Sequence, residues 1–208
     1  MRHFHLAHAR RNNGLRKGLA IRLRFGATHD EASRPLPGDE IVCAPILEAT
    51  HALTMSAPPE QIWPWLMQLG QGRAGFYSDS RLWDACVDAY YQLLSHGQGN
   101  TVTYRVLESE RVVPEWQNLR SGSEIIDGPP GTAYYVVKQI ERPQTLVLFT
   151  NTHLPFVVPA LLRTRVSGEI SVTYRLVPLG DGRTRFIRRM RTPCFVTQKI
   201  HASSSSGI

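Results

Sequence analysis

The chain has 208 residues, 42% apolar and 20% charged, which suits one globular domain with extra segments. No stretch holds the roughly 18 apolar residues that a membrane-spanning helix needs, and no secretory signal is visible. Cys43, Cys86 and Cys194 are far apart and lack metal-ligand spacing. We therefore expect free thiols, a cytoplasmic location, no bound metal and no cofactor.

The formal net charge of +7 belongs to the start of the chain. Residues 1–29 contain seven basic residues and no acidic one, and the remaining 17 basic and 17 acidic residues balance. We predict that residues 1–24 form a flexible basic arm. Four apolar residues are interspersed with its basic residues or follow them: Leu15, Leu19, Leu23 and Phe25. The arm could therefore lie on an anionic membrane instead. A nucleic-acid arm and a targeting peptide are further alternatives, although no specific nucleic-acid partner is expected.

The first half of the chain predicts an extended lead-in, a strand and two helices. Residues 34–39 are rich in proline and glycine and predict the lead-in, and a strand follows over residues 49–55. A Pro-Pro-Glu start and apolar residues at i, i+3, i+4 and i+7 then predict a core-facing helix that ends at Gly70. A second helix is expected over residues 80–94.

The second half of the chain predicts antiparallel strands separated by turns. The strands are expected over residues 133–140, 145–150, 170–176 and 183–191. This order of elements predicts an α+β domain over residues 25–192. A short polar tail, residues 193–208, ends in a serine run and is expected to be disordered.

Residues 70–75 match the GxGxxG pattern of dinucleotide-binding sites. That motif needs a strand before it and a helix N-terminus after it, so that backbone amides meet the pyrophosphate. Here the motif follows a helix. Its glycines are therefore expected to let the chain turn tightly out of that helix.

Three stretches resemble the polyketide cyclase/dehydrase-like members of the START/SRPBCC superfamily. They are FGAT with RPLPGDE (25–28 and 34–40), APP with WPWLMQLGQGRAGFYS (57–59 and 63–78), and VVPEWQNL (112–119). The resemblance covers about residues 25–192. It implies a helix-grip fold, in which a curved antiparallel sheet and helices enclose a cavity for a hydrophobic ligand. It transfers no catalytic residue.

The chain departs from that family after its last strand. Family members usually finish with a long helix that lies across the sheet and forms one wall of the cavity. Only residues 193–208 follow here, and they are too short and too polar for that helix. We therefore expect an open cavity, or one covered by another segment or a second chain.

The last strand offers a candidate anchor for a ligand. Thr184, Phe186, Arg188 and Met190 share one face of it. If this face lines the cavity, Arg188 would bind a carboxylate or phosphate. The alternatives are an ion pair with a carboxylate such as Glu124, and exposure to solvent.

Further candidate ligand contacts are one arginine in the glycine-rich loop and six aromatic residues. They are Arg73, Phe76, Tyr77, Trp83, Trp116, Tyr135 and Phe149. Aromatic side chains line many small-molecule sites, and tyrosine hydroxyls can orient the ligand. Core packing is the alternative for the aromatic residues, and a salt bridge that pins the loop is the alternative for Arg73.

Acid–base chemistry has few candidates in this sequence. Asp84 and Asp88 lie four residues apart on the second predicted helix, where a solvated face explains them. Glu115 and His153 are single candidates, and no partner for His153 is visible from sequence spacing.

The function these features predict is the binding of a small hydrophobic ligand, a lipid or a polyketide-like aromatic. One alternative is a cyclase/dehydratase-type enzyme acting on such a ligand, which requires an inward titratable group with a shifted pKa. The other alternative is a peripheral membrane or interaction module that uses the basic arm.

Overall fold

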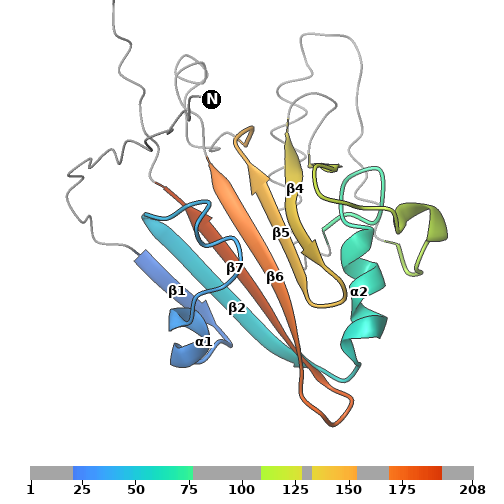
Figure 1. Cartoon of the computed structure of the whole chain (residues 1–208), viewed down its shortest axis with the longest axis horizontal. Helices are drawn as coiled ribbons and strands as arrows, with labels where there is room; N and C mark the ends of the chain where they lie inside the picture. Colours follow the sequence, from blue (N-terminus) through green and yellow to red (C-terminus); the bar gives the residue numbers. More distant parts are fainter. Residues whose placement is uncertain (1–20, 77–108, 128–132, 154–168, 194–208) are drawn as a thin grey trace, which may run out of the picture.

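The computed structural model describes residues 21–76, 109–127, 133–153 and 169–193. Within these ranges one seven-stranded sheet has the order β1-β2-β7-β6-β5-β4-β3 (Figure 1). The strands are β1 (Ile21–Phe25), β2 (Leu47–Met55), β3 (Glu124–Ile126), β4 (Tyr134–Glu141), β5 (Thr145–Thr150), β6 (Ile170–Pro178) and β7 (Thr184–Thr192). The helical elements are α1 (His29–Ser33), α2 (Pro59–Met67) and the short 3-10 helix η1 (Pro114–Trp116). Neighbouring strands are antiparallel, except that β1 and β2 are parallel.

The predicted strands are present, and their ends differ from the prediction by at most two residues. The first predicted helix is α2, whereas the predicted helix over residues 80–94 lies outside the described residues. Four elements were not predicted: β1, α1, η1 and β3. The last four residues of the predicted arm, 21–24, belong to strand β1, and α1 forms just before the predicted lead-in.

The start of α1 is fixed by a capping box. The Glu31 backbone N–H donates to Thr28 Oγ1 at 3.1 Å, and the Thr28 N–H donates to the Glu31 carboxylate at 2.7 Å. Two of the free N–H groups at the helix start are satisfied in this way. The helix nevertheless has only five residues and buries none of them, so contacts with the sheet must hold it in place.

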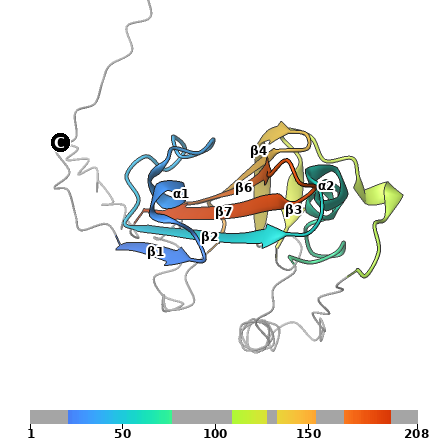
Figure 2. The same ribbon diagram turned by 90° about the horizontal axis from the view of Figure 1, so that it is seen from below.

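The two faces of the sheet have different characters. We call the face that packs against α2 the inner face, and its core joins apolar residues of the strands to Ile62 and Leu66 of the helix. The strand residues of this core include Val137, Leu146, Leu148, Val172, Tyr174 and Leu176. We call the opposite face the outer face, and α1 lies over it (Figure 2). The inner face is therefore the one on which an apolar ligand would find apolar partners.

The glycine-rich loop after α2 is a tight turn, as its position after a helix predicts. Gly70 and Gly75 exchange backbone hydrogen bonds of 2.9 and 3.0 Å, which close the loop. Gly70 has φ +119°, and a Cβ at this position would lie 2.8 Å from a methyl carbon of Ile125. Only glycine fits this position without strain.

The segment that contains η1 is held against α2 by polar side chains. Gln68 accepts a hydrogen bond from the Val113 N–H at 3.1 Å and donates to the Arg111 carbonyl at 3.1 Å. Gln117 donates to the Pro64 carbonyl at 3.1 Å. Hydrogen bonds therefore join the stretch 63–78 to the stretch 112–119. In the described ranges, no helix is long and apolar enough to cross a membrane.

Candidate functional site

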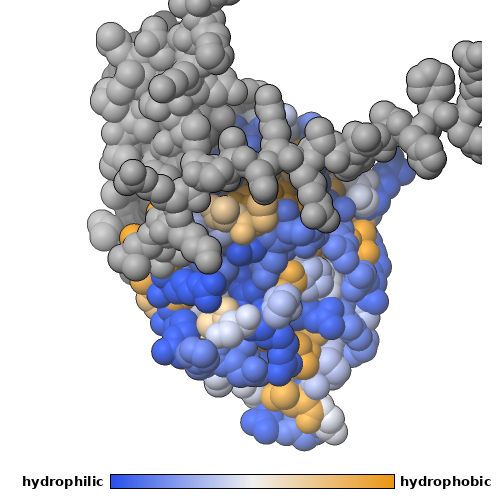
Figure 3. Space-filling model, turned by 60° about the vertical axis from the view of Figure 1, so that its left-hand side comes forward, coloured by the Kyte–Doolittle hydropathy of each residue, from blue (hydrophilic) through white to orange (hydrophobic). Residues whose placement is uncertain are grey.

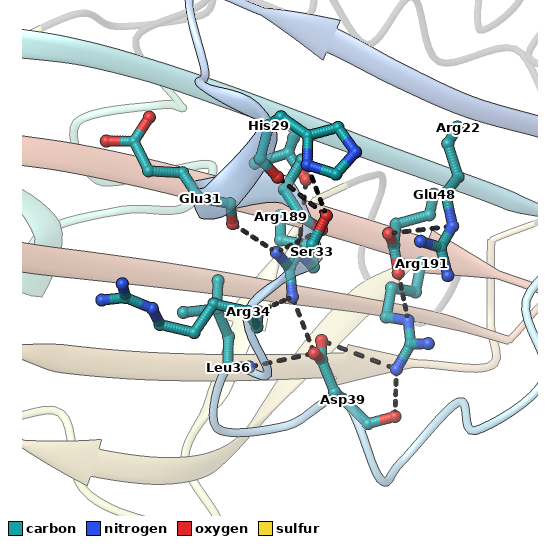
Figure 4. Close-up of polar contacts among 12 residues, drawn as sticks. Arg22, His29, Glu31, Ser33, Arg34, Leu36, Asp39, Glu48, Arg189 and Arg191 are labelled. Carbon is teal, nitrogen blue, oxygen red and sulfur yellow. Dashed lines mark hydrogen bonds and ion pairs between the residues drawn. The ribbon is translucent and has the colours of Figure 1, made fainter.

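Strand β7 directs Arg185, Arg189 and Arg191 to the outer face, and each of them is paired. Figure 4 shows the contacts of Arg189 and Arg191. Arg185 donates to both carboxylate oxygens of Glu31, at 2.7 and 2.9 Å. Arg191 lies 3.1 Å from the Glu48 carboxylate. The ion pair of Arg185 therefore binds the sheet to α1, whereas the pair of Arg191 with Glu48 joins two neighbouring strands.

Arg189 is the most enclosed of the three, with 2% of its surface exposed. It donates to the Asp39 carboxylate at 2.7 Å and to Thr50 Oγ1 at 3.2 Å. It also donates to the carbonyls of Glu31, Ala32 and Arg34, at 2.7, 3.0 and 3.0 Å. Those carbonyls form the C-terminal end of α1, where a cation is favourable. Arg189 is therefore a structural residue.

Arg188 points to the inner face and has different surroundings. It lies between His51 of β2 and Tyr174 of β6 in the register of the sheet. No hydrogen bond or ion pair joins its guanidinium to any described residue. Burial, and then the charge of Arg188, lower the pKa of His51. The described part of the chain therefore leaves a partly buried cation without an anion on an apolar face.

Two tyrosines share this face with Arg188. Tyr174 is 7% exposed and belongs to the core, and the ring of Tyr135 packs against the same core. Burial raises the pKa of Tyr135, the negative charge of Asp127 raises it further, and Arg188 opposes these effects. The Tyr135 hydroxyl therefore stays protonated and able to donate a hydrogen bond.

Trp63 adds a further donor to the inner core. Its side chain lies in α2 and is 5% exposed. The indole N–H has no hydrogen-bond partner among the described residues. Buried donors of this kind are normally satisfied, so the orphaned N–H is an available contact for a bound acceptor.

A histidine and an aspartate meet where β3 and β5 end. His153 Nε2 lies 2.6 Å from Asp127 Oδ2, and its Nδ1 lies 2.8 Å from Thr150 Oγ1. The His153 ring also packs against Tyr135, with ring centroids 4.6 Å apart. The partner that sequence spacing did not reveal for His153 is therefore Asp127. It lies 26 residues earlier, and only the pairing of the strands brings the two together.

The structure brings some predicted site residues together and separates others. Phe76 packs against Tyr135, with ring centroids 5.9 Å apart. Phe149 follows Val147 on the outer face, where Lys138 Nζ lies 5.2 Å from its ring centroid. Phe149 is therefore not grouped with Tyr135 and Arg188. Tyr77 and Trp83 lie outside the described residues.

Arg73 and Trp116 join the glycine-rich loop to η1. The Arg73 guanidinium donates to the Met67 carbonyl at 2.8 Å and to the Trp116 carbonyl. These bonds pin the loop, as the alternative reading of Arg73 anticipated, although the acceptors are carbonyls and not a carboxylate. Both residues remain predictions as ligand contacts.

Metal ligation is not supported by the part of the chain that the structure describes, where no three His, Cys, Asp or Glu side chains cluster. A cavity of about 140 Å³ lies between β1 and α1. Its lining includes Arg22, Arg24 and His29, so it belongs to the edge of the sheet and not to the surroundings of Arg188.

Comparison with known proteins adds little to this geometry. No family model matches the chain, and no curated protein matches it. A crystal structure of CalU16 from Micromonospora echinospora is similar at 14% sequence identity, with a TM-score of 0.30. The alignment covers 71% of this chain and 59% of that chain, which is less than two thirds of its length. A TM-score this low carries no argument, so what the inner face can bind follows from its own residues.

Proposed function

We propose that this chain is a helix-grip domain that binds a small amphiphile on the inner face of its sheet. The apolar body of the ligand would pack beside Arg188 on the partly buried inner-face residues Phe186 and Met190. Its carboxylate, phosphate or similar anionic group would bind Arg188, with Tyr135, Tyr174 and Trp63 as further donors. The order of β2, α2 and then antiparallel strands supports a helix-grip arrangement, with β1 and α1 as additions before it.

The contrast among the arginines of β7 is the observation that carries the proposal. Arg185, Arg189 and Arg191 each have a carboxylate partner, whereas Arg188 has none among the described residues. A cation in apolar surroundings is costly unless it is paired. An anionic ligand would offset this cost through charge-assisted hydrogen bonds. Apolar burial would add about 25 cal/mol per Å², less the cost of ordering the ligand.

Native mass spectrometry of the purified full-length protein tests this proposal, with denaturing extraction to identify anything bound. We expect an acidic amphiphile at close to one molecule per chain. Arg188→Met should lose it. Arg183→Met should retain it, because Arg183 pairs with Asp181 in the exposed β6–β7 turn. Wild-type protein without a bound molecule, or a ligand retained by Arg188→Met, would count against the proposal.

An acid–base enzyme acting on such a ligand is the second candidate. The observation that favours it is the contact of His153 with both Asp127 and Tyr135 near the inner face. A carboxylate that orients a histidine, beside a protonated phenol, can move protons on a bound substrate. If the extracted molecule is converted by the wild type and not by Asp127→Asn, the chain is an enzyme. If the molecule is recovered unchanged, the chain is a binding protein.

A further inference from the structure

The edge strand β1 exposes an apolar face that no described residue covers. Ile21, Leu23 and Phe25 alternate along it and are 53%, 41% and 50% exposed. Leu53 of β2 is 50% exposed on the same face, and Ile46 beside Ile21 is 38% exposed. Apolar residues gathered at one edge mark an interaction surface more often than isolated ones do.

The charges around β1 have one sign. Arg22 and Arg24 alternate with the apolar residues, and Arg22 has a 64% exposed side chain. Five more basic residues and no acidic one precede β1 in the sequence. On the side of the molecule that carries β1, hydrophobic residues lie next to hydrophilic ones (Figure 3).

The cavity between β1 and α1 is part of this basic edge. Arg22, Arg24 and His29 line it, together with Ser33. The carboxylate of Glu48 also lines it but is balanced by Arg22 at 3.7 Å and Arg191 at 3.1 Å. Its volume is about 140 Å³.

We propose that this edge docks on an anionic lipid bilayer. The apolar side chains on one side of β1 enter the interface, and Arg22 and Arg24, on the other side of the same strand, bind lipid phosphates beside the cavity. An anionic bilayer is the occupant whose chemistry matches both features, because it offers an apolar layer beneath negative groups. The apolar side chains of β1 lie on the same face of the sheet as Arg188, with His51 between Phe25 and Arg188 in the register, but Arg188 is not part of the docking surface.

A second copy of the chain fits this edge less well. Two β1 strands paired antiparallel around Leu23 would place Arg22 of each copy opposite Arg24 of the other. Like charges directly opposite one another destabilise a strand pair. A nucleic acid would satisfy the arginines but would leave the apolar face exposed.

Co-sedimentation of the full chain with lipid vesicles tests the proposal. We expect binding to phosphatidylcholine vesicles that contain phosphatidylserine, weak binding to phosphatidylcholine alone, and loss of binding at high salt. Equal binding to both kinds of vesicle, or no binding to either, would overturn the proposal.

A matched pair of variants separates the β1 face from the arm. Leu23→Ser should weaken vesicle binding about tenfold, because a leucine no longer enters the interface. Leu179→Ser should leave binding unchanged, because Leu179 is 42% exposed in the β6–β7 turn, away from this edge. Arg24→Gln should weaken binding about fivefold. Circular dichroism verifies that each variant is folded.

Two results would overturn the proposal in favour of another partner. If Leu23→Ser binds vesicles as tightly as wild type, the basic arm acts alone through charge and β1 is not the docking surface. If wild-type protein is a dimer by analytical ultracentrifugation and Leu23→Ser is a monomer, the edge joins two copies of the chain.

Discussion

The arginines of β7 differ in what surrounds their charge. Arg189 is 2% exposed and makes five hydrogen bonds, so its desolvation is offset by Asp39, Thr50 and the end of α1. Arg188, one residue earlier, is partly buried and has no such bond to a described residue. Because successive side chains of a strand point to opposite faces, neighbours in sequence serve different purposes.

Replacing each of these two arginines by methionine should therefore change stability differently. Arg189→Met leaves Asp39 and the carbonyls of α1 without their donor, and should lower the free energy of unfolding by about 3 kcal/mol or more. Arg188→Met removes an unpaired cation from an apolar face, and should leave that free energy unchanged or raise it. Urea unfolding of both variants measures the difference. An equal loss in the two would show that Arg188 also has a structural partner.

The titration of His51 reports the charge of Arg188. Burial lowers the pKa of His51 first, and Arg188 lowers it further. Arg188→Met should therefore raise the pKa of His51, as should an anion bound to Arg188 in the wild type. NMR titration of the imidazole measures both shifts. A His51 pKa that is the same in wild type and Arg188→Met would show that the two side chains do not interact.

Part of the site could be predicted from the sequence. Strict alternation along residues 184–190 placed Arg188 on the face of Phe186 and Met190, and the register with β6 confirms that placement. The partner of His153 could not be predicted, because Asp127 reaches it only through the pairing of β3, β4 and β5. The sequence could not show that Tyr135 points to the inner face and Phe149 to the outer face. The face that a side chain takes depends on the register of its strand, which the sequence does not fix.

At the scale of elements, α1 is held by side chains of β7 and not by its own burial. The helix buries no residue, and Arg185 and Arg189 connect it to the sheet from 154 or more positions away. The sequence contained one signal for this helix, the Thr28-x-x-Glu31 capping box. β1 was missed because its five residues lie in a basic run that resembles an amphipathic arm.

Acid should loosen this connection over a defined pH range. The hydrogen bond from Arg185, and then bonds from Thr28, hold the pKa of Glu31 at about 2 against a usual 4.5, although burial opposes them. Because the folded pKa is the lower one, the unfolded chain binds more protons as the pH falls. This contribution to stability is complete above pH 4.5 and is lost as the pH falls to about 2.

The variant Glu31→Gln should remove that part of the pH dependence. Its free energy of unfolding should lie below that of wild type at neutral pH and approach it as the pH falls towards about 2. Asp30→Asn is the matched control, since Asp30 is 71% exposed and, among the described residues, pairs with exposed Arg34. A gap between wild type and Glu31→Gln that stays constant with pH would contradict this account.

At the scale of the whole molecule, the described residues place different polar groups on the two faces of one sheet. The outer face is closed by ion pairs with α1 and residues 34–40, so its charges stabilise the fold. The inner face combines an apolar core with donors that lack acceptors in the described residues. Such a division suits a binding protein, because a ligand then supplies the missing acceptors.

Fluorescence titration with two matched probes tests the role of Arg188 most directly. Anilinonaphthalene sulfonate and N-phenylnaphthylamine share one aromatic body, and only the first carries an anionic group. We predict that wild-type protein binds the sulfonate at one site and that Arg188→Met weakens this binding about tenfold or more, as expected for one charge-assisted contact. Binding of the neutral probe should not change. Sulfonate binding that is equally tight in wild type and Arg188→Met would contradict the assignment of Arg188 as the anchor of the ligand.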